Sequence, residues 1–268
     1  MERQVYSTLV RDSGMSQRTL QSLFRSYLSK VPVVKIKSKS QVHLLIDGTY
    51  FSNGLCLIVY YDYDIRYVQY FRHTDKEKMR EIKQDLENLR TLGVDVYSVT
   101  CDGHKSILGA IKKVYPQAII QRCLVHIKRQ VRNYLSEKPQ TEISRQLLYL
   151  SKRITYIRSD EQANVWIMQF KKWYEINEEY VCEKSKNEQT GRDWFTHKNL
   201  HLATMHIINA LPYMFAYLND PEIPYTTNRL ENYFTHLKEK LTLHRGLRSS
   251  SKKNFIKWYI YLKNSQSK

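Results

Sequence analysis

Three acidic residues, separated by long stretches of chain, lie where carboxylates could serve phosphoryl-transfer chemistry. Asp47 ends the apolar run LLID, Asp102 ends SVTCD, and Glu231 lies near the start of a predicted helix in TNRLEN. Phosphodiester chemistry without a covalent intermediate uses two divalent cations, one activating the attacking hydroxyl and the other steadying the leaving oxygen. Hard cations such as Mg²⁺ prefer carboxylate oxygens. We therefore expect these three residues to converge on one metal-binding cluster.

Each carboxylate also has a simpler interpretation. Asp47-Gly48 could form a hairpin turn, but Asn53-Gly54 is a stronger turn signal and would leave Asp47 inside the strand. Asp102 could be a helix N-cap, a role that Asp often takes. Glu231 could lie on a solvated helix face. A metal site therefore requires the joint arrangement of the three residues.

Two Cys-x-x-His pairs, at Cys101/His104 and Cys123/His126, contain the residue types of a zinc site. The 18 residues between the pairs hold a predicted helix and strand of the core, which argues against a shared metal. We interpret His126 as a polar contact near the scissile phosphate, with packing of the site wall as the alternative. Cys123 is interpreted as a small buried apolar residue.

The elements that must position these residues follow from hydrophobic periodicity. Three strands joined by turns come first, and helices then alternate with two further strands. A capping box formed by Thr74 and Glu77 is expected to open the first of these helices, and Gly93 to end it. The predicted strands are 41–51, 55–62, 65–71, 94–102 and 118–123, and the predicted helices are 74–92, 104–114 and 124–135.

This order is typical of an RNase H-like α/β domain, which has a mixed sheet with helices on both faces. In such a sheet the first and fourth strands are neighbours, so that Asp47 and Asp102 could face one another. Residues 136–224 show few strand signals and are interpreted as a helical insertion. Helices then resume at 228–241 and 252–262.

The N-terminal segment predicts two short helices, 5–12 and 15–28, joined by a turn at Ser13-Gly14. This pattern matches a helix-turn-helix that binds DNA, with an ordinary helical hairpin as the alternative. The second helix would expose four polar residues to DNA: Gln17, Arg18, Gln21 and Arg25.

Charge is concentrated at the two ends of the chain. The 268 residues have a formal net charge of +17, with 43 Lys+Arg against 26 Asp+Glu. The segments 1–46 and 232–268 carry most of this surplus, which predicts nucleic-acid-binding arms on a nearly neutral body. Solubility alone is the alternative explanation. Further candidate phosphate contacts are Lys128, Arg129, Arg132 and Arg229.

Composition also bears on compartment. No apolar run reaches the roughly 18 residues that span a bilayer, and the N-terminus lacks a signal-peptide pattern, so no membrane partner is expected. The four scattered cysteines do not suggest a disulfide framework. These features predict a cytoplasmic protein, associated with the nucleoid if its source is prokaryotic. Trp166, Trp173 and Trp194 in the insertion are interpreted mainly as core residues, with base stacking as the alternative.

Three segments carry a family resemblance: DGTYF at 47–51, CDGHKSILGAI to QRCLVH at 101–126, and TNRLENYFTHLK at 227–238. They resemble DDE transposases of the mutator-like group of insertion sequences. The resemblance implies an RNase H-like core interrupted by a helical insertion, with the DDE triad at Asp47, Asp102 and Glu231 and the Cys-x-x-His signature at Cys123 and His126. It further implies two Mg²⁺ or Mn²⁺ ions per site.

The resulting hypothesis is a transposase that cuts and joins DNA at the ends of a mobile element. The expected domains are a helix-turn-helix-like segment (1–40), the core in two parts (41–135 and 225–268) and the insertion (136–224). A mobile element has two ends, and one chain offers one centre, so we expect at least a dimer on DNA. The alternatives are an inactive transposase-derived DNA-binding protein and an RNase H-like nuclease.

Overall fold

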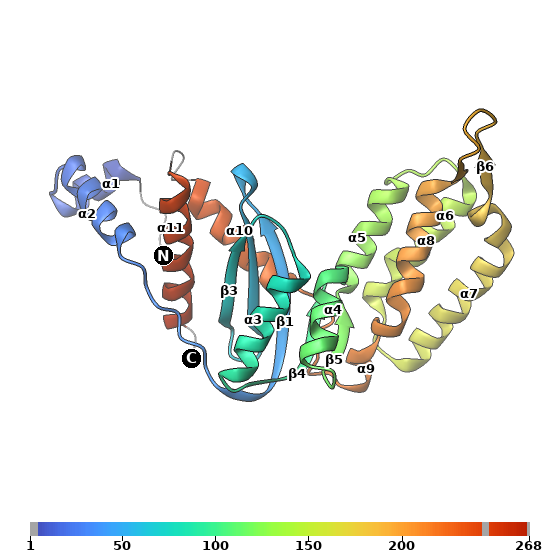
Figure 1. Cartoon of the computed structure of the whole chain (residues 1–268), viewed down its shortest axis with the longest axis horizontal. Coiled ribbons are helices and arrows are strands. Elements are labelled where there is room, and N and C mark those ends of the chain that lie inside the picture. The colour runs from blue at the N-terminus through green and yellow to red at the C-terminus, as the bar shows by residue number, and fades with distance from the viewer. Residues whose placement is uncertain (1–4, 243–246, 267–268) are drawn as a thin grey trace. The chain divides into compact units, whose positions relative to one another are not determined.

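A computed structural model describes residues 5–242 and 247–266 of the chain. The chain divides into two compact units, one formed by Met1–Val96 with Asn228–Lys268 and the other by Tyr97–Thr227. Each unit is described by itself below, and most of its helices and strands are labelled in Figure 1. The predicted domains are defined by their expected roles, whereas these two units are defined by compactness. The predicted domain boundaries therefore stay a prediction.

The first unit is built on three antiparallel strands: β1 (Lys39–Tyr50), β2 (Cys56–Asp62) and β3 (Tyr67–Thr74). A short 3₁₀ turn, Ser52–Gly54, joins β1 to β2, as the Asn53-Gly54 signal predicts. In the β1–β2 register, Asp47 lies opposite Val59. Asp47 is therefore inside the strand, and its interpretation as a turn residue is wrong.

Helices cover both faces of these strands. Leu45 and Val59 pack in one hydrophobic cluster with Leu230 and Phe234 of α10 (Asn228–Thr242) and with residues of α11 (Ser249–Ser265). Successive strand residues point to opposite faces, so Tyr60 lies on the other side. There its hydroxyl donates a hydrogen bond to Asp85 of α3 (Met79–Thr91), at 3.0 Å.

The predicted capping box before α3 is wrong. Thr74 is the last residue of β3, where it pairs with Cys56, so it cannot be the residue that precedes the helix. The helix begins at Met79 after Lys78, which makes no side-chain cap. The Thr74 hydroxyl instead donates to Glu81 in the first turn of α3, at 2.6 Å.

Two helices, α1 (Tyr6–Ser13) and α2 (Gln17–Ser29), confirm the predicted N-terminal pair. Gly14 ends α1 with a φ of 67°, a left-handed conformation that glycine adopts without strain. Ser16 caps α2 by accepting the backbone N–H of Thr19. From α11, the Trp258 indole donates to the backbone oxygens of Tyr27 and Lys30. DNA binding by this pair stays a prediction.

The second unit begins within β4 (Val94–Cys101), which continues from the first unit. Its partner β5 (Ile119–Arg122) runs parallel, with Cys101 opposite Arg122. The helix α4 (Lys105–Val114) joins them, and α5 (Leu124–Leu135) follows β5. The hydrogen-bonded strand order is β3-β2-β1-β4-β5, which confirms an α/β class with a mixed sheet.

The segment after α5 is mostly helical, as predicted. Its elements are α6 (Glu142–Arg153), α7 (Asp160–Cys182), α8 (Lys198–Ala210), α9 (Ala216–Asn219) and the 3₁₀ turns Ile154–Tyr156 and Leu211–Tyr213. Trp166 and Phe170 of α7 share a core with Ile127 and Val131 of α5, so this segment is continuous with the helix that follows β5.

A small hairpin, β6 (Lys184–Lys186) and β7 (Asp193–Phe195), interrupts these helices and was not predicted. Its strands have three residues each and are exposed or half-buried, too short and too polar to give a strand periodicity. Within the described ranges, no helix combines the length and the apolar character that crossing a bilayer requires.

Candidate active site

Asp47 is positioned by the interior of β1. Strand alternation places its side chain on the face of Leu45, which packs against α10. The residue is 7% exposed, and its Oδ1 accepts the backbone N–H of Gly48 at 2.9 Å. A carboxylate held in a rigid strand with a defined orientation is well placed to act as a ligand.

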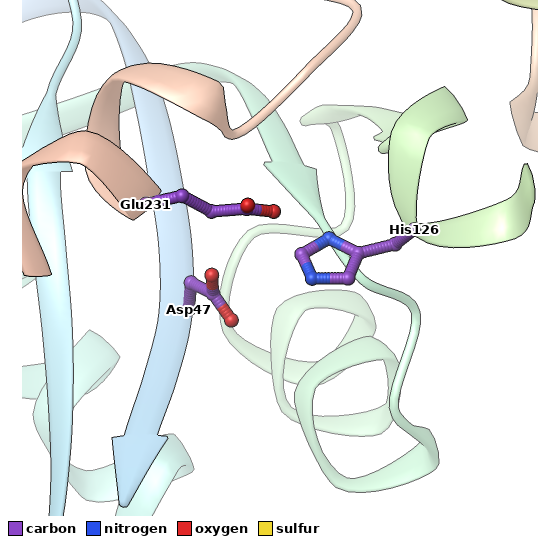
Figure 2. Close-up of side chains that lie close together, drawn as sticks. All are labelled: Asp47, His126 and Glu231. Atoms are coloured by element: carbon purple, nitrogen blue, oxygen red, sulfur yellow. The ribbon is translucent and has the colours of Figure 1, made fainter. Parts of the chain in front are cut away.

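Glu231 lies in the first turn of α10, whose buried residues Leu230 and Phe234 fix the helix on the sheet. A carboxylate oxygen of Glu231 lies within 4.8 Å of one from Asp47. Figure 2 shows the two side chains close together, Asp47 from β1 and Glu231 from α10. Two negative charges at this separation repel each other, and a cation between them would reverse that cost.

Glu77 also approaches β1, and sequence reasoning assigned it elsewhere. A Cβ added to Gly48 would lie 2.1 Å from Glu77 Oε1, so a larger residue at position 48 would displace this carboxylate from its present position. Burial raises the pKa of the nearby Cys56 thiol to about 11, and the charge of Glu77 acts in the same direction. The sequence signal for this contact is the Asp47-Gly48 dipeptide, in which the glycine allows close packing and does not form a turn.

Asp102 belongs to the second unit and follows β4 directly. Its Oδ1 accepts the backbone N–H of His104 at 2.7 Å, in a tight turn through Gly103. His104 holds the N-cap position of α4, and its side chain makes no capping hydrogen bond. The N-cap interpretation of Asp102 is therefore wrong, because the turn ends one residue before the helix begins.

The Cys123/His126 pair is joined by Thr227, which sequence reasoning missed. The Thr227 hydroxyl is 3.3 Å from His126 Nδ1, and the backbone N–H of Thr227 donates to Cys123 Sγ at 3.3 Å. Burial acts to raise the pKa of Cys123, but hydrogen bonds from His126 and Thr227 lower it overall. The sulfur is thus a buried hydrogen-bond acceptor, and Thr227 orients the imidazole that extends from α5 (Figure 2).

The predicted DNA contacts differ in accessibility. On α2, Gln17, Arg18 and Arg25 are exposed and Gln21 is half-buried. The three cationic residues of α5 are half-buried or exposed: Lys128, Arg129 and Arg132. One guanidinium nitrogen of Arg129 lies 3.4 Å from His126 Nε2, and Arg132 forms a 3.4 Å ion pair with Glu137. Their contacts with DNA stay predictions.

Arg229 is held against the β2–β3 turn. Its NH1 donates to the backbone oxygen of Tyr63 at 2.7 Å, and its guanidinium lies 3.9 Å from the centre of the Tyr63 ring. This arrangement gives Arg229 a packing role in addition to the predicted phosphate contact.

Two of the three tryptophans of the insertion are core residues, as predicted. Trp166 and Trp173 are buried, and the Trp166 indole donates to Leu150 O at 2.9 Å. Trp194, on β7, is 48% exposed. Base stacking is therefore open to Trp194 and excluded for the other two while the core is intact.

Within the first unit the structure brings Asp47 and Glu231 together. Asp102 and His126 belong to the second unit, so the convergence of all three carboxylates stays a prediction. The chemistry of the donor set fits Mg²⁺ or Mn²⁺, because hard oxygen ligands from acidic side chains suit these ions.

Comparison with known proteins gives two findings and one negative result. A model of the family described as "Transposase, Mutator family" matches residues 65–238. The comparison with curated proteins gives no match. Among solved structures, the chain is similar to one from the cryo-EM structure of the simian T-cell lymphotropic virus intasome in complex with PP2A regulatory subunit B56 gamma, at 13% identity and a TM-score of 0.26.

That alignment covers 64% of this chain and 59% of the viral-complex chain, so this chain spans less than two thirds of its length.

Proposed function

Because the chain belongs to the Mutator family of transposases, we propose that it is a DDE transposase with an RNase H-like core. It cleaves DNA at the ends of a mobile element and joins the freed 3′ ends to target DNA. The strand order β3-β2-β1-β4-β5, with antiparallel β1–β3 and parallel β4–β5, supports the core assignment.

The observation that carries the proposal is the pair formed by Asp47 and Glu231. These residues are 184 positions apart, yet their carboxylate oxygens lie within 4.8 Å. Asp47, Glu231 and Asp102 would hold two Mg²⁺ or Mn²⁺ ions. When bound, such ions lower the pKa of an attacking hydroxyl and stabilise the charge on the leaving oxygen.

The remaining residues bind and orient. His126, held by Thr227, would contact a phosphate oxygen, and no side chain is needed as a nucleophile. Exposed Arg18 and Arg25 of α2 would contact the DNA backbone outside the reaction centre. Since a mobile element has two ends, the working unit is at least a dimer on DNA.

The test is substitution of each carboxylate. Asp47→Asn, Asp102→Asn and Glu231→Gln should each lower Mn²⁺-dependent nicking of supercoiled plasmid about 1,000-fold, equivalent to about 4 kcal/mol of transition-state stabilisation. DNA affinity, measured by fluorescence anisotropy in EDTA, should change less than about threefold. Exposed acids on the same elements give matched controls: Asp95→Asn on β4 and Glu239→Gln on α10 should keep full activity.

Two outcomes would contradict the proposal. Nicking that survives any one of the three substitutions would remove that residue from the metal cluster. Nicking lost together with DNA affinity would indicate a binding defect instead.

Sedimentation of the chain with a duplex bearing the repeats that flank its gene tests assembly, and a strictly 1:1 complex that still joins two ends would exclude the dimer.

A further inference from the structure

A buried arginine lies beside Asp102 in the second unit. Arg122 is the last residue of β5, opposite Cys101 in the parallel ladder, and it is 4% exposed. The ladder places it at the same edge of the sheet as the turn that follows β4. A charged side chain is rarely buried this deeply without a partner that offsets its desolvation.

The guanidinium packs directly on the turn that carries Asp102. A Cβ added to Gly103 would lie 1.8 Å from Arg122 Nε and 1.9 Å from Cζ. Gly103 also has a φ of 83°, a conformation that other residues adopt only with strain. Glycine is therefore required twice at this position: for the turn itself and for the space that Arg122 fills.

The electrostatic surroundings point to Asp102 as the charge partner of Arg122. Burial lowers the pKa of Arg122, while Cys101, Asp102 and Cys123 act in the opposite direction, and of these Asp102 is the carboxylate. Arg122 Nε is buried and has no hydrogen-bond partner in the described part of the chain. Nearby His206 contributes no competing negative charge, since imidazole is neutral or cationic.

We propose that Arg122 is a positioning residue, whose guanidinium packs against Gly103 and holds the Asp102 carboxylate in the orientation needed to bind metal. This inference rests on the proposed function, because it takes Asp102 as a metal ligand. At 4% exposure Arg122 cannot reach DNA directly, so it acts through Asp102. Groups that orient metal ligands in this way typically change metal affinity 10- to 100-fold.

The test measures Mn²⁺ binding by the full-length chain, using electron paramagnetic resonance of free Mn²⁺ at constant pH. We expect Arg122→Gln to weaken Mn²⁺ binding at the Asp102 site about 10-fold or more. Arg122→Lys keeps the charge but loses the planar group that packs on Gly103, and it should show a smaller, several-fold loss. Gly103→Ala should resemble Arg122→Lys, because its methyl group displaces the guanidinium.

Two further variants make the result decisive. Arg145→Gln, at an exposed arginine of the same unit that pairs with Glu142, is the matched control and should bind Mn²⁺ like the unmodified chain. Asp102→Asn distinguishes failure of the proposed function from failure of the positioning role. If Asp102→Asn leaves Mn²⁺ binding unchanged, the proposed function loses this ligand.

If Asp102→Asn weakens binding while Arg122→Gln and Arg122→Lys match the unmodified chain, the positioning role is overturned and the proposed function stands. Thermal unfolding of each variant identifies any that does not fold. Should Arg122→Gln fail to fold, Arg122→Lys decides: several-fold weaker Mn²⁺ binding supports the role, and unchanged binding overturns it.

Discussion

Each unit holds an arginine beside a carboxylate, half-buried Arg72 in the first and buried Arg122 in the second, and their hydrogen bonding differs. In the first unit, Arg72 Nε donates to both carboxylate oxygens of Asp85, at 2.9 and 2.8 Å, and the Tyr60 hydroxyl completes the network. In the second unit, Arg122 Nε has no partner among the residues described, although Asp102 lies close by. The first arrangement is complete in itself.

This difference separates structural from functional use of buried charge. The hydrogen bond with Asp85 raises the pKa of Arg72, and Asp85 is fully buried, so this pair has no capacity for a further ligand. Asp102, by contrast, is half-buried. Removing one partner of a fully bonded buried pair is costly, whereas a buried polar atom without a partner needs a further explanation, which the proposed positioning role of Arg122 supplies.

The largest effect is expected from breaking the complete pair. Asp85→Ala leaves the Arg72 guanidinium without its carboxylate and should lower the free energy of unfolding by about 3–5 kcal/mol. Urea denaturation followed by circular dichroism measures this change. Glu87→Gln breaks an exposed ion pair with Lys83 on the same helix and should cost at most about 0.5 kcal/mol. Equal losses for the two variants would contradict the assignment.

A smaller effect is expected from pH, because each unit holds a histidine kept neutral by burial. Burial lowers the pKa of His73 to about 4, with Lys257 and Lys253 adding to the shift. Burial, and next Arg122, lower the pKa of His206 to about 4. The folded pKa values lie below the unfolded value of about 6.5, so their contribution to stability is complete above pH 6.5.

That contribution should be lost as the pH falls from about 6.5 through 4, by on the order of 2 kcal/mol in total after allowance for partial exposure. His73→Gln should flatten the slope of the free energy of unfolding against pH, by the part that comes from the first unit. Exposed His236 provides the control, and His236→Gln should leave the slope as it was. A slope that the His73 substitution does not alter would assign the pH dependence to other groups.

Arg122→Met should cost less than the corresponding change in the first unit. Replacing an incompletely bonded buried charge with an apolar side chain of similar length is often close to neutral, so we expect a change within about 1 kcal/mol. Arg72→Met should cost about 3–5 kcal/mol, because it leaves the buried Asp85 carboxylate unpaired. If both substitutions destabilise equally, Arg122 is as structural as Arg72.

The smallest effect concerns DNA affinity through α2. Arg18→Gln and Arg25→Gln should each reduce the slope of log affinity against log salt by about 1, with no change in unfolding. Substitution is preferable to deletion of α2. The Trp258 indole of α11 donates hydrogen bonds at the end of α2, so deleting α2 would disturb α11. An unchanged salt slope in the double variant would remove α2 from the DNA interface.

Local patterns predicted most of the elements, and distant contacts explain what they missed. The turn at Asn53-Gly54 and the alternation of β1 placed Asp47 inside its strand. By contrast, Thr227 bonds to Cys123 across 104 positions, a contact that no local pattern indicates. Thr74 followed by Glu77 had the spacing of a capping box, but pairing of Thr74 in β3 overrode that preference.

The first unit is completed only by the end of the chain. Val68 of β3 exchanges hydrogen bonds with Asn264 of α11, 196 positions later, and Asp47 meets a helix that begins at Asn228. During synthesis, residues 97–227 emerge and can fold first, while β1–β3 wait for their covering helices. The Asp47–Glu231 pair therefore forms late on the ribosome, and a nascent or prematurely terminated chain that ends before α10 lacks this pair of carboxylates.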